Sequence, residues 1–324
     1  MRLWVLGLVL IPVLLAGAAF LGVAAVGLGS VAGAPHSRGT NGLWLGHTWV
    51  DSAYSPADLA ALVGKVRAGE FRDLFVHVGP LSDNGSLNPA LAPGAARLLT
   101  ALHASLPGVR VQAWLGDVVG PGRMNLADPA TRARIVASAR AVLDLGFAGV
   151  HYDLEPVPSG DAGYLALLVA THPLTQARHA VLSVAADQLE PFPGLAGPEQ
   201  LLAGLPHWWS GTFLGQVAGR VDEIAVMSYD TGMPTGAAYS GYVRMQTRLA
   251  LDAVPARVSL LIGLPAYHTD ELGHTGAETV AAAVRGVRLA LRGESAPVGV
   301  AFYADFSATP ADWSAYESGW VHPS

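Results

Sequence analysis

The sequence predicts an α/β protein, a (β/α)8 barrel preceded by an N-terminal hydrophobic segment. Eight short β-rich runs are spread along the chain from residue 42 onward, and helical patterns fall between them. Strands that alternate with helices imply parallel strands joined by crossover helices, and eight such units close a barrel. A doubly wound open sheet is the alternative, but no Gly-rich phosphate-binding sequence follows an early strand.

The eight predicted strands are rich in aliphatic, β-branched and aromatic residues, and turn-forming residues bound them. They span residues 42–50, 73–79, 109–116, 147–155, 180–187, 222–230, 257–267 and 298–306. In a closed barrel of parallel strands the active site lies at the carboxyl ends of the strands. Candidate functional residues are therefore sought at the ends of these eight runs.

Helices are predicted in four of the intervals, over residues 55–70, 128–146, 276–293 and 309–319. Three of them open with the usual start signal, a capping Ser, Asp or Thr followed by proline at the first helical position. The second helix also has a stop signal, because Gly146 follows it as a natural C-cap. These boundaries support the β-then-α order of the barrel.

Residues 1–34 are predicted to be a signal anchor or a signal peptide, residues 35–41 a short linker, and residues 42–324 the (β/α)8 barrel domain. Residues 3–34 carry no charge, and about 20 apolar residues suffice to span a membrane. The run is long for a cleaved signal, so we expect export with a membrane anchor. Cleavage after Ala18 or Ala34, giving a secreted protein, stays open as the alternative; Pro35 would hinder the second site.

Composition excludes several classes of function. The chain has 324 residues, 51% of them hydrophobic and 14% charged, which is ample for one large core. A net charge of -6 indicates no basic face for nucleic acid, and the lack of cysteine excludes disulfides and thiolate chemistry. His47 and His77 near two strand ends are too few for a barrel metallohydrolase. We expect a monomer without metal or cofactor.

The stretch FAGVHYDLEP, residues 147–156, carries the clearest chemical signal. His151, Asp153 and Glu155 alternate with apolar residues, so all three share one face of a strand. Charged groups are rarely buried unless a site opens around them. Two neighbouring carboxyl groups resist joint ionisation, so one keeps its proton to higher pH and can act as a general acid. The sequence therefore predicts an acid catalyst at the end of this strand.

This stretch resembles the strand-4 signature of glycoside hydrolase family 18, the chitinases and their relatives. That signature reads Asp-x-x-Asp-x-Asp-x-Glu, usually within Phe-Asp-Gly-Ile-Asp-x-Asp-x-Glu. The matching residues are Phe147, Gly149, Asp153 and Glu155. The first two aspartates are missing, because Ala148 and His151 occupy their places. A neutral His151 would donate a hydrogen bond to Asp153, whereas a protonated one would stabilise the Asp153 anion and lower the pKa of Glu155.

Later strands extend the resemblance over residues 43 to 306. "IAVMSYD" resembles the Met-x-Tyr-Asp motif of strand 6, "IGLPAYH" resembles the Gly-Leu-Pro-x-Tyr-Gly pattern of strand 7, and "GVAFYAD" resembles the end of strand 8 with tyrosine in place of the usual tryptophan. The Ser-x-Gly-Gly of strand 3 is absent. These segments add Met227, Tyr229, Asp230, Tyr267 and Tyr303 to the candidate site residues. Trp114, in the third strand where the Ser-x-Gly-Gly motif is absent, is a further candidate.

The resemblance implies retaining hydrolysis assisted by the substrate, an exception to the usual scheme of two carboxylates. Glu155 would protonate the glycosidic oxygen, and Asp153 would orient the N-acetyl group that attacks the anomeric carbon. Tyr229 would hydrogen-bond the acetamide oxygen, and Tyr303 would form an apolar floor. Asp230, His151, Tyr267, Met227 and Trp114 are the further candidates for binding the carbohydrate.

Three functions remain open at this point. The first is hydrolysis of glycans containing β-linked N-acetylglucosamine, such as chitin fragments or peptidoglycan. The second is a non-catalytic carbohydrate-binding barrel, which the two lost aspartates favour and the retained Asp153 and Glu155 oppose. The third is a glycosidase of other sugar specificity. The choice between hydrolysis and non-catalytic binding depends on His151, which either adjusts the pKa of Glu155 or marks a lost activity.

Overall fold

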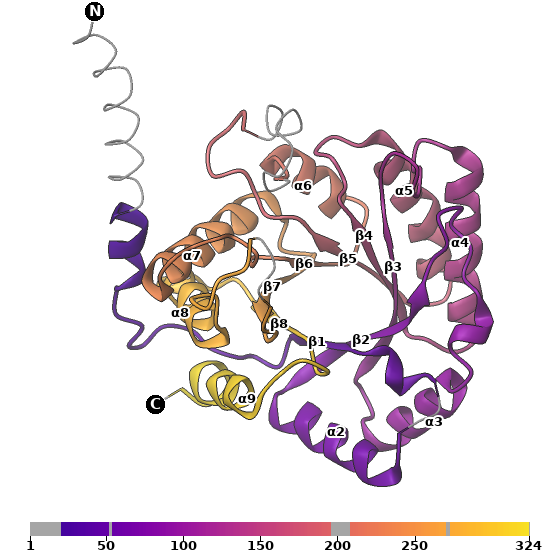
Figure 1. Ribbon diagram of the computed structural model, residues 1–324, viewed down its shortest axis with the longest axis horizontal. Coiled ribbons are helices and arrows are strands. Elements are labelled where there is room, and N and C mark those ends of the chain that lie inside the picture. Colours follow the sequence, from indigo (N-terminus) through magenta and orange to yellow (C-terminus); the bar gives the residue numbers. More distant parts are fainter. Residues whose placement is uncertain (1–20, 52–53, 196–207, 270–272, 324) are drawn as a thin grey trace, which may run out of the picture.

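The computed structural model describes residues 21–51, 54–195, 208–269 and 273–323, and it forms a closed barrel of eight parallel strands (Figure 1). The strands follow one another around the barrel in sequence order. They are β1 (Asn41–Leu45), β2 (Phe71–Pro80), β3 (Arg110–Val118), β4 (Gly149–Glu155), β5 (Val181–Ala186), β6 (Glu223–Val226), β7 (Ser259–Pro265) and β8 (Val298–Tyr303). The predicted (β/α)8 barrel is confirmed.

Helices surround the barrel, as the ribbon shows (Figure 1). They are α2 (Pro56–Ala68), α3 (Ala95–Ser105), α4 (Pro129–Asp144), α5 (Ala162–Gln176), α6 (Gly211–Ala218), α7 (Gly236–Ala253), α8 (Val280–Leu291) and α9 (Pro310–Tyr316). The four predicted helices correspond to α2, α4, α8 and α9. Ser55 and Thr309 form capping boxes, and Asp128 accepts two backbone hydrogen bonds at the start of α4.

Several predicted strands are shorter in the structure, and β1 and β6 fall furthest short of their predicted carboxyl ends. β1 ends at Leu45, and residues His47–Trp49 form a single 3-10 turn. β6 ends at Val226, four residues before Asp230. In both places residues of types that favour strands continue past the end of the ladder. Their pairing is supplied by side chains, as where Asp305 accepts from the Trp49 indole at 2.6 Å.

The apolar core has two parts, which follow from the alternation of side chains along the strands. The larger lies between barrel and helices and includes the outward-facing Leu43, Val150 and Tyr152. The smaller lies inside the barrel, where Trp44 and Phe75 pack together. Because the interior cluster is small, polar side chains occupy the space below and above it.

The base of the barrel interior is closed by an ionic group that we name the basal cluster, comprising Arg72, Asp73, Arg110, Gln112 and Glu223. Arg110 donates to both carboxylates, at 2.6 Å to Asp73 and 2.8 Å to Glu223. Burial alone would raise the pKa of Asp73, but the two arginines hold it below its usual value. Burial and the charge of Asp73 raise the pKa of Glu223 to about 8.

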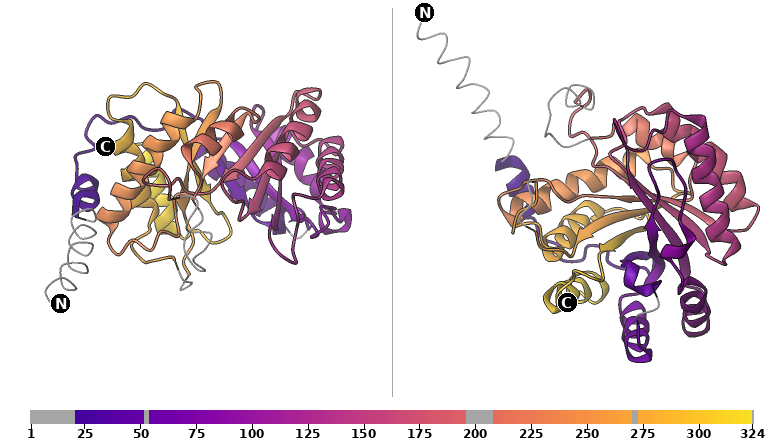
Figure 2. Two further views of the ribbon diagram at one scale, coloured as in Figure 1. Left: turned by 90° about the horizontal axis from the view of Figure 1, so that it is seen from above. Right: turned by 45° about the vertical axis from the view of Figure 1, so that its right-hand side comes forward.

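The N-terminal part of the described chain is docked on the outside of the barrel. Residues 21–27 are helical and lie beside α7 and α8 in every view (Figures 1 and 2). A side chain at Gly241 would lie 1.9 Å from the carbonyl oxygen of Val23, so only glycine permits this approach. Arg285 donates to the carbonyls of Gly27 and Gly29 at 2.7 and 2.6 Å.

The predicted anchor lies mainly outside the described residues, which begin at residue 21. Within the described part of the chain no helix is both long and apolar enough to cross a membrane. Export and anchoring therefore stay predictions.

We predict that Arg110→Ala lowers the free energy of unfolding by about 3 kcal/mol, because it leaves two buried carboxylates with only one of the two arginines that compensate their charge. Urea unfolding followed by tryptophan fluorescence measures the loss. Arg178→Ala is the matched control, since it removes an exposed ion pair with Asp144 and should cost about 0.5 kcal/mol or less. Equal losses in the two variants would contradict the role of the basal cluster.

Candidate active site

β4 carries the central side chains to the carboxyl end of the barrel. Its register sets His151 opposite Trp114 of β3 and Ser183 of β5, and Asp153 opposite Gly116. A side chain at Gly116 would lie 3.1 Å from the backbone oxygen of Asp153, so glycine here lets the two strands approach. Glu155 is the last residue of β4 and reaches furthest toward the mouth.

A cavity of about 440 Å³ opens above these residues, and we name it the catalytic cavity. It is lined by Trp44, Asp153, Glu155, Met227, Tyr229, Asp230, Tyr267, His268, Thr269, Tyr303, Phe306 and Ser307. The structure thus brings together seven of the nine predicted site residues, from β4 and the segments that follow or end β6, β7 and β8. His151 and Trp114 are the two that do not line this cavity.

Four aromatic side chains form one side of the catalytic cavity, and we name them the aromatic wall: Trp44, Tyr229, Tyr267 and Tyr303. Tyr303 is central, with its ring 5.4 Å from Trp44, 5.7 Å from Tyr229 and 5.6 Å from Tyr267. A side chain at Gly263 would lie 2.8 Å from the Tyr229 ring, so this glycine makes room for the tyrosine. Flat apolar faces beside carboxyl groups suit the binding of a sugar ring.

The two carboxyl groups at the cavity floor interact with each other. Burial, together with the negative charge of Asp153, raises the pKa of Glu155 well above that of an ordinary glutamate. Burial also raises the pKa of Asp153, although the hydrogen bond with Glu155 opposes that shift. The surroundings therefore favour the protonated form more strongly for Glu155 than for Asp153. This is the state a general acid requires near neutral pH.

A third carboxyl group faces the same pair from the end of β5. Burial and the charge of Asp153 raise the pKa of Asp187 to about 7. The charge of Asp187 in turn contributes to the raised pKa of Glu155. Asp187 also lines a second cavity with Glu155, so it is both close to the acid and open to a ligand.

His151 lies below the catalytic cavity, fully buried and stacked on Phe75 at 4.0 Å. Its Nδ1 lies 2.7 Å from the hydroxyl of Ser183, which itself donates to Gln112 of the basal cluster. Since that hydroxyl proton is used, His151 donates through Nδ1 and its Nε2 is an acceptor, with no hydrogen-bond partner among the described residues.

The charge state of His151 follows from its surroundings. Burial lowers the pKa of His151 to about 3, although the charge of Asp73 opposes the shift. These surroundings favour the neutral imidazole, the first of the two alternatives for His151. The expected donation from His151 to Asp153 is not found, because the Nδ1 proton points to Ser183.

Trp114 lies beside the active site without lining the catalytic cavity. It is 8% exposed, and its ring centre is 6.2 Å from Tyr303 and 4.7 Å from His77. Burial and the neighbouring His47 lower the pKa of His77 to about 4, so this histidine is neutral. Trp114 therefore supports the aromatic wall from behind.

The catalytic cavity continues past Glu155 into two further cavities. One, of about 380 Å³, is lined by Glu155, Pro156, Asp187, Gln188 and Val118 among others. The next, of about 580 Å³, shares Pro156 and is bounded by residues 119–127 of the loop after β3. The three cavities are neighbours because they share lining residues. Glu155 lines both the catalytic cavity and the cavity of about 380 Å³, so it lies between these two.

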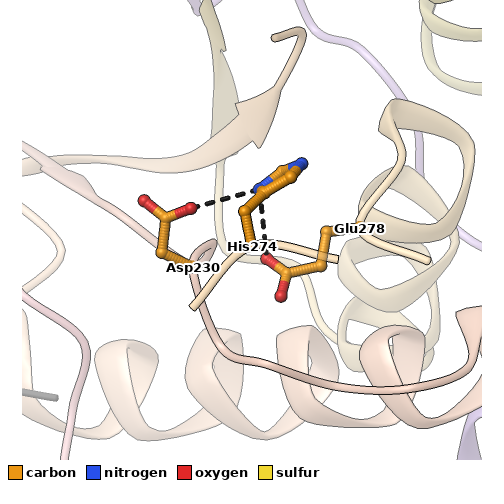
Figure 3. A group of neighbouring side chains, drawn as sticks. All are labelled: Asp230, His274 and Glu278. Carbon is orange, nitrogen blue, oxygen red and sulfur yellow. Dashed lines mark hydrogen bonds and ion pairs between the residues drawn. The ribbon is translucent and has the colours of Figure 1, made fainter. Parts of the chain in front are cut away.

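One group of side chains in the described chain places metal-ligand atoms within 4.8 Å of one another: Asp230, His274 and Glu278 (Figure 3). Carboxylate oxygens and an imidazole nitrogen are ligands that zinc or manganese accepts. The distance of 3.1 Å between His274 Nδ1 and Asp230 Oδ1 is, however, already that of a hydrogen bond. The group therefore needs no ion to explain its geometry.

Sequence reasoning missed several residues of the catalytic cavity. Trp44 carried a usable signal, since it alternates with Leu43 and Leu45 and so faces the barrel interior. Thr269, Phe306 and Ser307 lie in loops after β7 and β8, where no periodic pattern indicates the direction of a side chain. Contacts between loops decided their placement.

Comparison with known proteins finds the same fold in solved structures. A chitinase from Chromobacterium violaceum shares 17% identity over 86% of this chain and 98% of its own, with a TM-score of 0.58. The spore cortex-lytic enzyme SleL of Bacillus megaterium shares 13% identity over 88% of this chain and 75% of its own, with a TM-score of 0.61. A class V chitinase from Pseudomonas fluorescens shares 16% identity over 86% of this chain and 98% of its own, with a TM-score of 0.57.

No protein-family model matches the sequence, and no curated protein matches it either. The chain has the barrel of chitinases and of a cortex-lytic enzyme at low sequence identity. The resemblance read from the strand motifs is consistent with this finding, and it describes a divergent chitinase-like barrel.

We predict that Asp187→Asn moves the alkaline limb of the pH profile to lower pH. Removing the negative charge of Asp187 lowers the pKa of Glu155, so the acid loses its proton at lower pH. The profile of kcat/KM against pH, with a substrate that the unaltered protein cleaves, measures this shift. Asp144→Asn on the outer surface should leave the profile in place, and an unmoved limb in Asp187→Asn would contradict the coupling.

Proposed function

We propose that this protein is a glycoside hydrolase that cleaves glycans containing β-linked N-acetylglucosamine, with retention of configuration and with help from the substrate's acetamide. The observation that carries the proposal is the placement of Glu155 beside Asp153 in a cavity walled by aromatic rings, where burial and the charge of Asp153 raise the pKa of Glu155. The fold shared with chitinases and a cortex-lytic enzyme supports the same class of reaction.

In the first step Glu155 gives its proton to the glycosidic oxygen, and the bond from that oxygen to the anomeric carbon breaks. The acetamide oxygen of the same sugar forms a new bond to the anomeric carbon, which gives a cyclic oxazolinium ion. Asp153 lies below Glu155, where its negative charge stabilises this cation as Glu155 loses its proton. The hydroxyl of Tyr229 donates to the acetamide oxygen and orients it.

In the second step Glu155, now ionised, takes a proton from water. The water oxygen bonds to the anomeric carbon, the bond from that carbon to the acetamide oxygen breaks, and Glu155 is protonated again. Asp153 and Glu155 both project from β4, so they approach the sugar from one side. This arrangement suits assistance by the substrate better than a pair of carboxylates that flank the bond.

The cavities on both sides of Glu155 support cleavage inside a glycan chain. The aromatic wall would hold the sugars on the non-reducing side, and the loop at residues 119–127 would border those on the other. Chitin fragments and peptidoglycan glycans both offer N-acetylglucosamine next to a β-linkage. A non-catalytic carbohydrate-binding barrel is the competing function. Assays of turnover and of binding on the same oligomers distinguish it from a hydrolase.

We predict that the unaltered protein cleaves chromogenic N-acetylglucosamine oligomers and that Glu155→Gln lowers kcat by about 10²–10⁴-fold, because the proton donor is lost. Asp153→Asn should also lower kcat strongly. A thiazoline mimic of the oxazolinium should inhibit the unaltered protein if the acetamide takes part. Turnover unchanged in Glu155→Gln would refute the acid assignment.

Isothermal titration with the same oligomers distinguishes the competing function. Binding without turnover by the unaltered protein would favour a carbohydrate-binding barrel. Glu294→Gln is the matched control for loss of a glutamate, since Glu294 pairs with Arg248 outside the catalytic cavity. It should keep full activity.

We further propose that the protein is exported and retained at a membrane by its N-terminal segment. The uncharged run of residues 3–34 supports this, as does the docking of residues 21–31 on α7 and α8. Arg288 donates to the carbonyl of Val31 and Arg292 to that of Ser30, so cleavage after Ala34 would remove carbonyl partners of Arg285, Arg288 and Arg292.

Expression of the full chain in bacteria, followed by fractionation and N-terminal sequencing, tests this proposal. We expect the protein in the membrane fraction, outside the cytoplasm, with residues 21–34 retained. A soluble protein that begins at Pro35 would refute the anchor.

A further inference from the structure

We propose that His274 and Glu278 are positioning residues that hold Asp230 in place for binding the sugar; the inference rests on the proposed function. Neither residue belongs to the strand motifs on which the site was predicted. Both lie in the segment between β7 and α8, and Asp230 follows β6 (Figure 3).

Asp230 is a side chain that requires support. It lines both the catalytic cavity and the cavity on the other side of Glu155. Its backbone has a φ of 58°, a left-handed conformation that is costly for a residue other than glycine. Half of the side chain is exposed, so the protein surface alone does not fix its direction.

Two donors meet on the same oxygen of Asp230. The hydroxyl of Tyr267 donates to Oδ1 at 2.5 Å, and His274 Nδ1 lies 3.1 Å from the same atom. The rings of Tyr267 and His274 are themselves in contact, with centres 4.6 Å apart. With Oδ1 held in this way, Oδ2 is the oxygen left to accept from a sugar hydroxyl.

Glu278 fixes the backbone on the other side of Asp230. Its Oε1 accepts from the amides of Thr231 and Gly232 and from the Thr231 hydroxyl, at 2.9 to 3.0 Å. The amide of Gly232 also donates to the carbonyl of Gly273 at 2.6 Å. These bonds join the segment after β6 to the segment before α8 and hold the left-handed turn at Asp230.

Glu278 also orients the imidazole. Its Oε2 is buried, has no hydrogen-bond partner within the described residues, and lies 3.9 Å from His274 Nδ1. The side chain of His274 is 5% exposed, so packing limits its rotation. A negative charge beside Nδ1 favours the tautomer with its proton on that nitrogen, which is the form that donates to Asp230.

A double-mutant cycle on N-acetylglucosamine oligomers tests the proposal. We expect His274→Ala to raise KM about tenfold with a smaller change in kcat, the size expected for loss of a hydrogen bond to a charged group. In the Asp230→Ala background the same change should have almost no effect, because His274 acts only through Asp230. Equal effects in both backgrounds would overturn the proposal.

Two further variants separate positioning from general loss of structure. His274→Asn keeps a donor near the place of Nδ1 and should recover most of the affinity. His172→Ala removes the imidazole of a histidine–aspartate pair elsewhere, 3.2 Å from Asp222, and should leave KM unchanged. Failure of His274→Asn to recover affinity, with the fold intact by circular dichroism, would count against the hydrogen bond.

A measurement that needs no substrate tests the contact between His274 and Asp230 even if the proposed function is wrong. Nitrogen-15 NMR of the histidines in the unliganded protein should show His274 protonated at Nδ1, with that resonance shifted in Asp230→Ala. An unshifted resonance would overturn the proposal even if the protein hydrolyses glycans. Titration with ZnCl2 or MnCl2 addresses the metal alternative: tight one-to-one binding lost in His274→Ala would assign the three side chains to an ion instead.

Discussion

The register of β4 between β3 and β5 is the constraint on which the rest of the site depends. It puts His151, Asp153 and Glu155 on the inner face, and a slip by one residue would turn all three toward the helices. The closed ladder of eight strands prevents such a slip, because each strand is bonded on both sides. The positions of Glu155 and Asp153 are therefore properties of the whole barrel.

Polar groups inside the barrel follow from that register. Asp73 and Glu223 enter at the base, where two arginines compensate their charge, and Gln112 and Ser183 continue the hydrogen bonds up to His151. A barrel interior of small volume would ordinarily be filled by apolar side chains. Here a bonded polar column reaches His151, in the layer below Asp153 and Glu155, and burial keeps His151 neutral against the charge of Asp73.

Much of the fold could be predicted from the sequence because its signals are local. Alternation marked the strands, and caps at Ser55, Asp128 and Thr309 marked helix starts. The ends of β1 and β6 could not be predicted in this way, since residues such as Trp49 and Tyr229 favour strands wherever they occur. These strands end where their hydrogen bonds to the neighbouring strands end. Which residues find such partners depends on the tertiary structure.

The sequence by itself determined the barrel, the inward direction of Asp153 and Glu155, and the motif segments that surround them. Only the tertiary structure decided the state of His151, because its partner Ser183 lies 32 residues away on another strand. The same holds for Asp187 beside the acid and for His274 and Glu278 behind Asp230. Alternation fixes which face a side chain takes, whereas pKa and hydrogen bonding depend on distances between segments that the fold alone brings together.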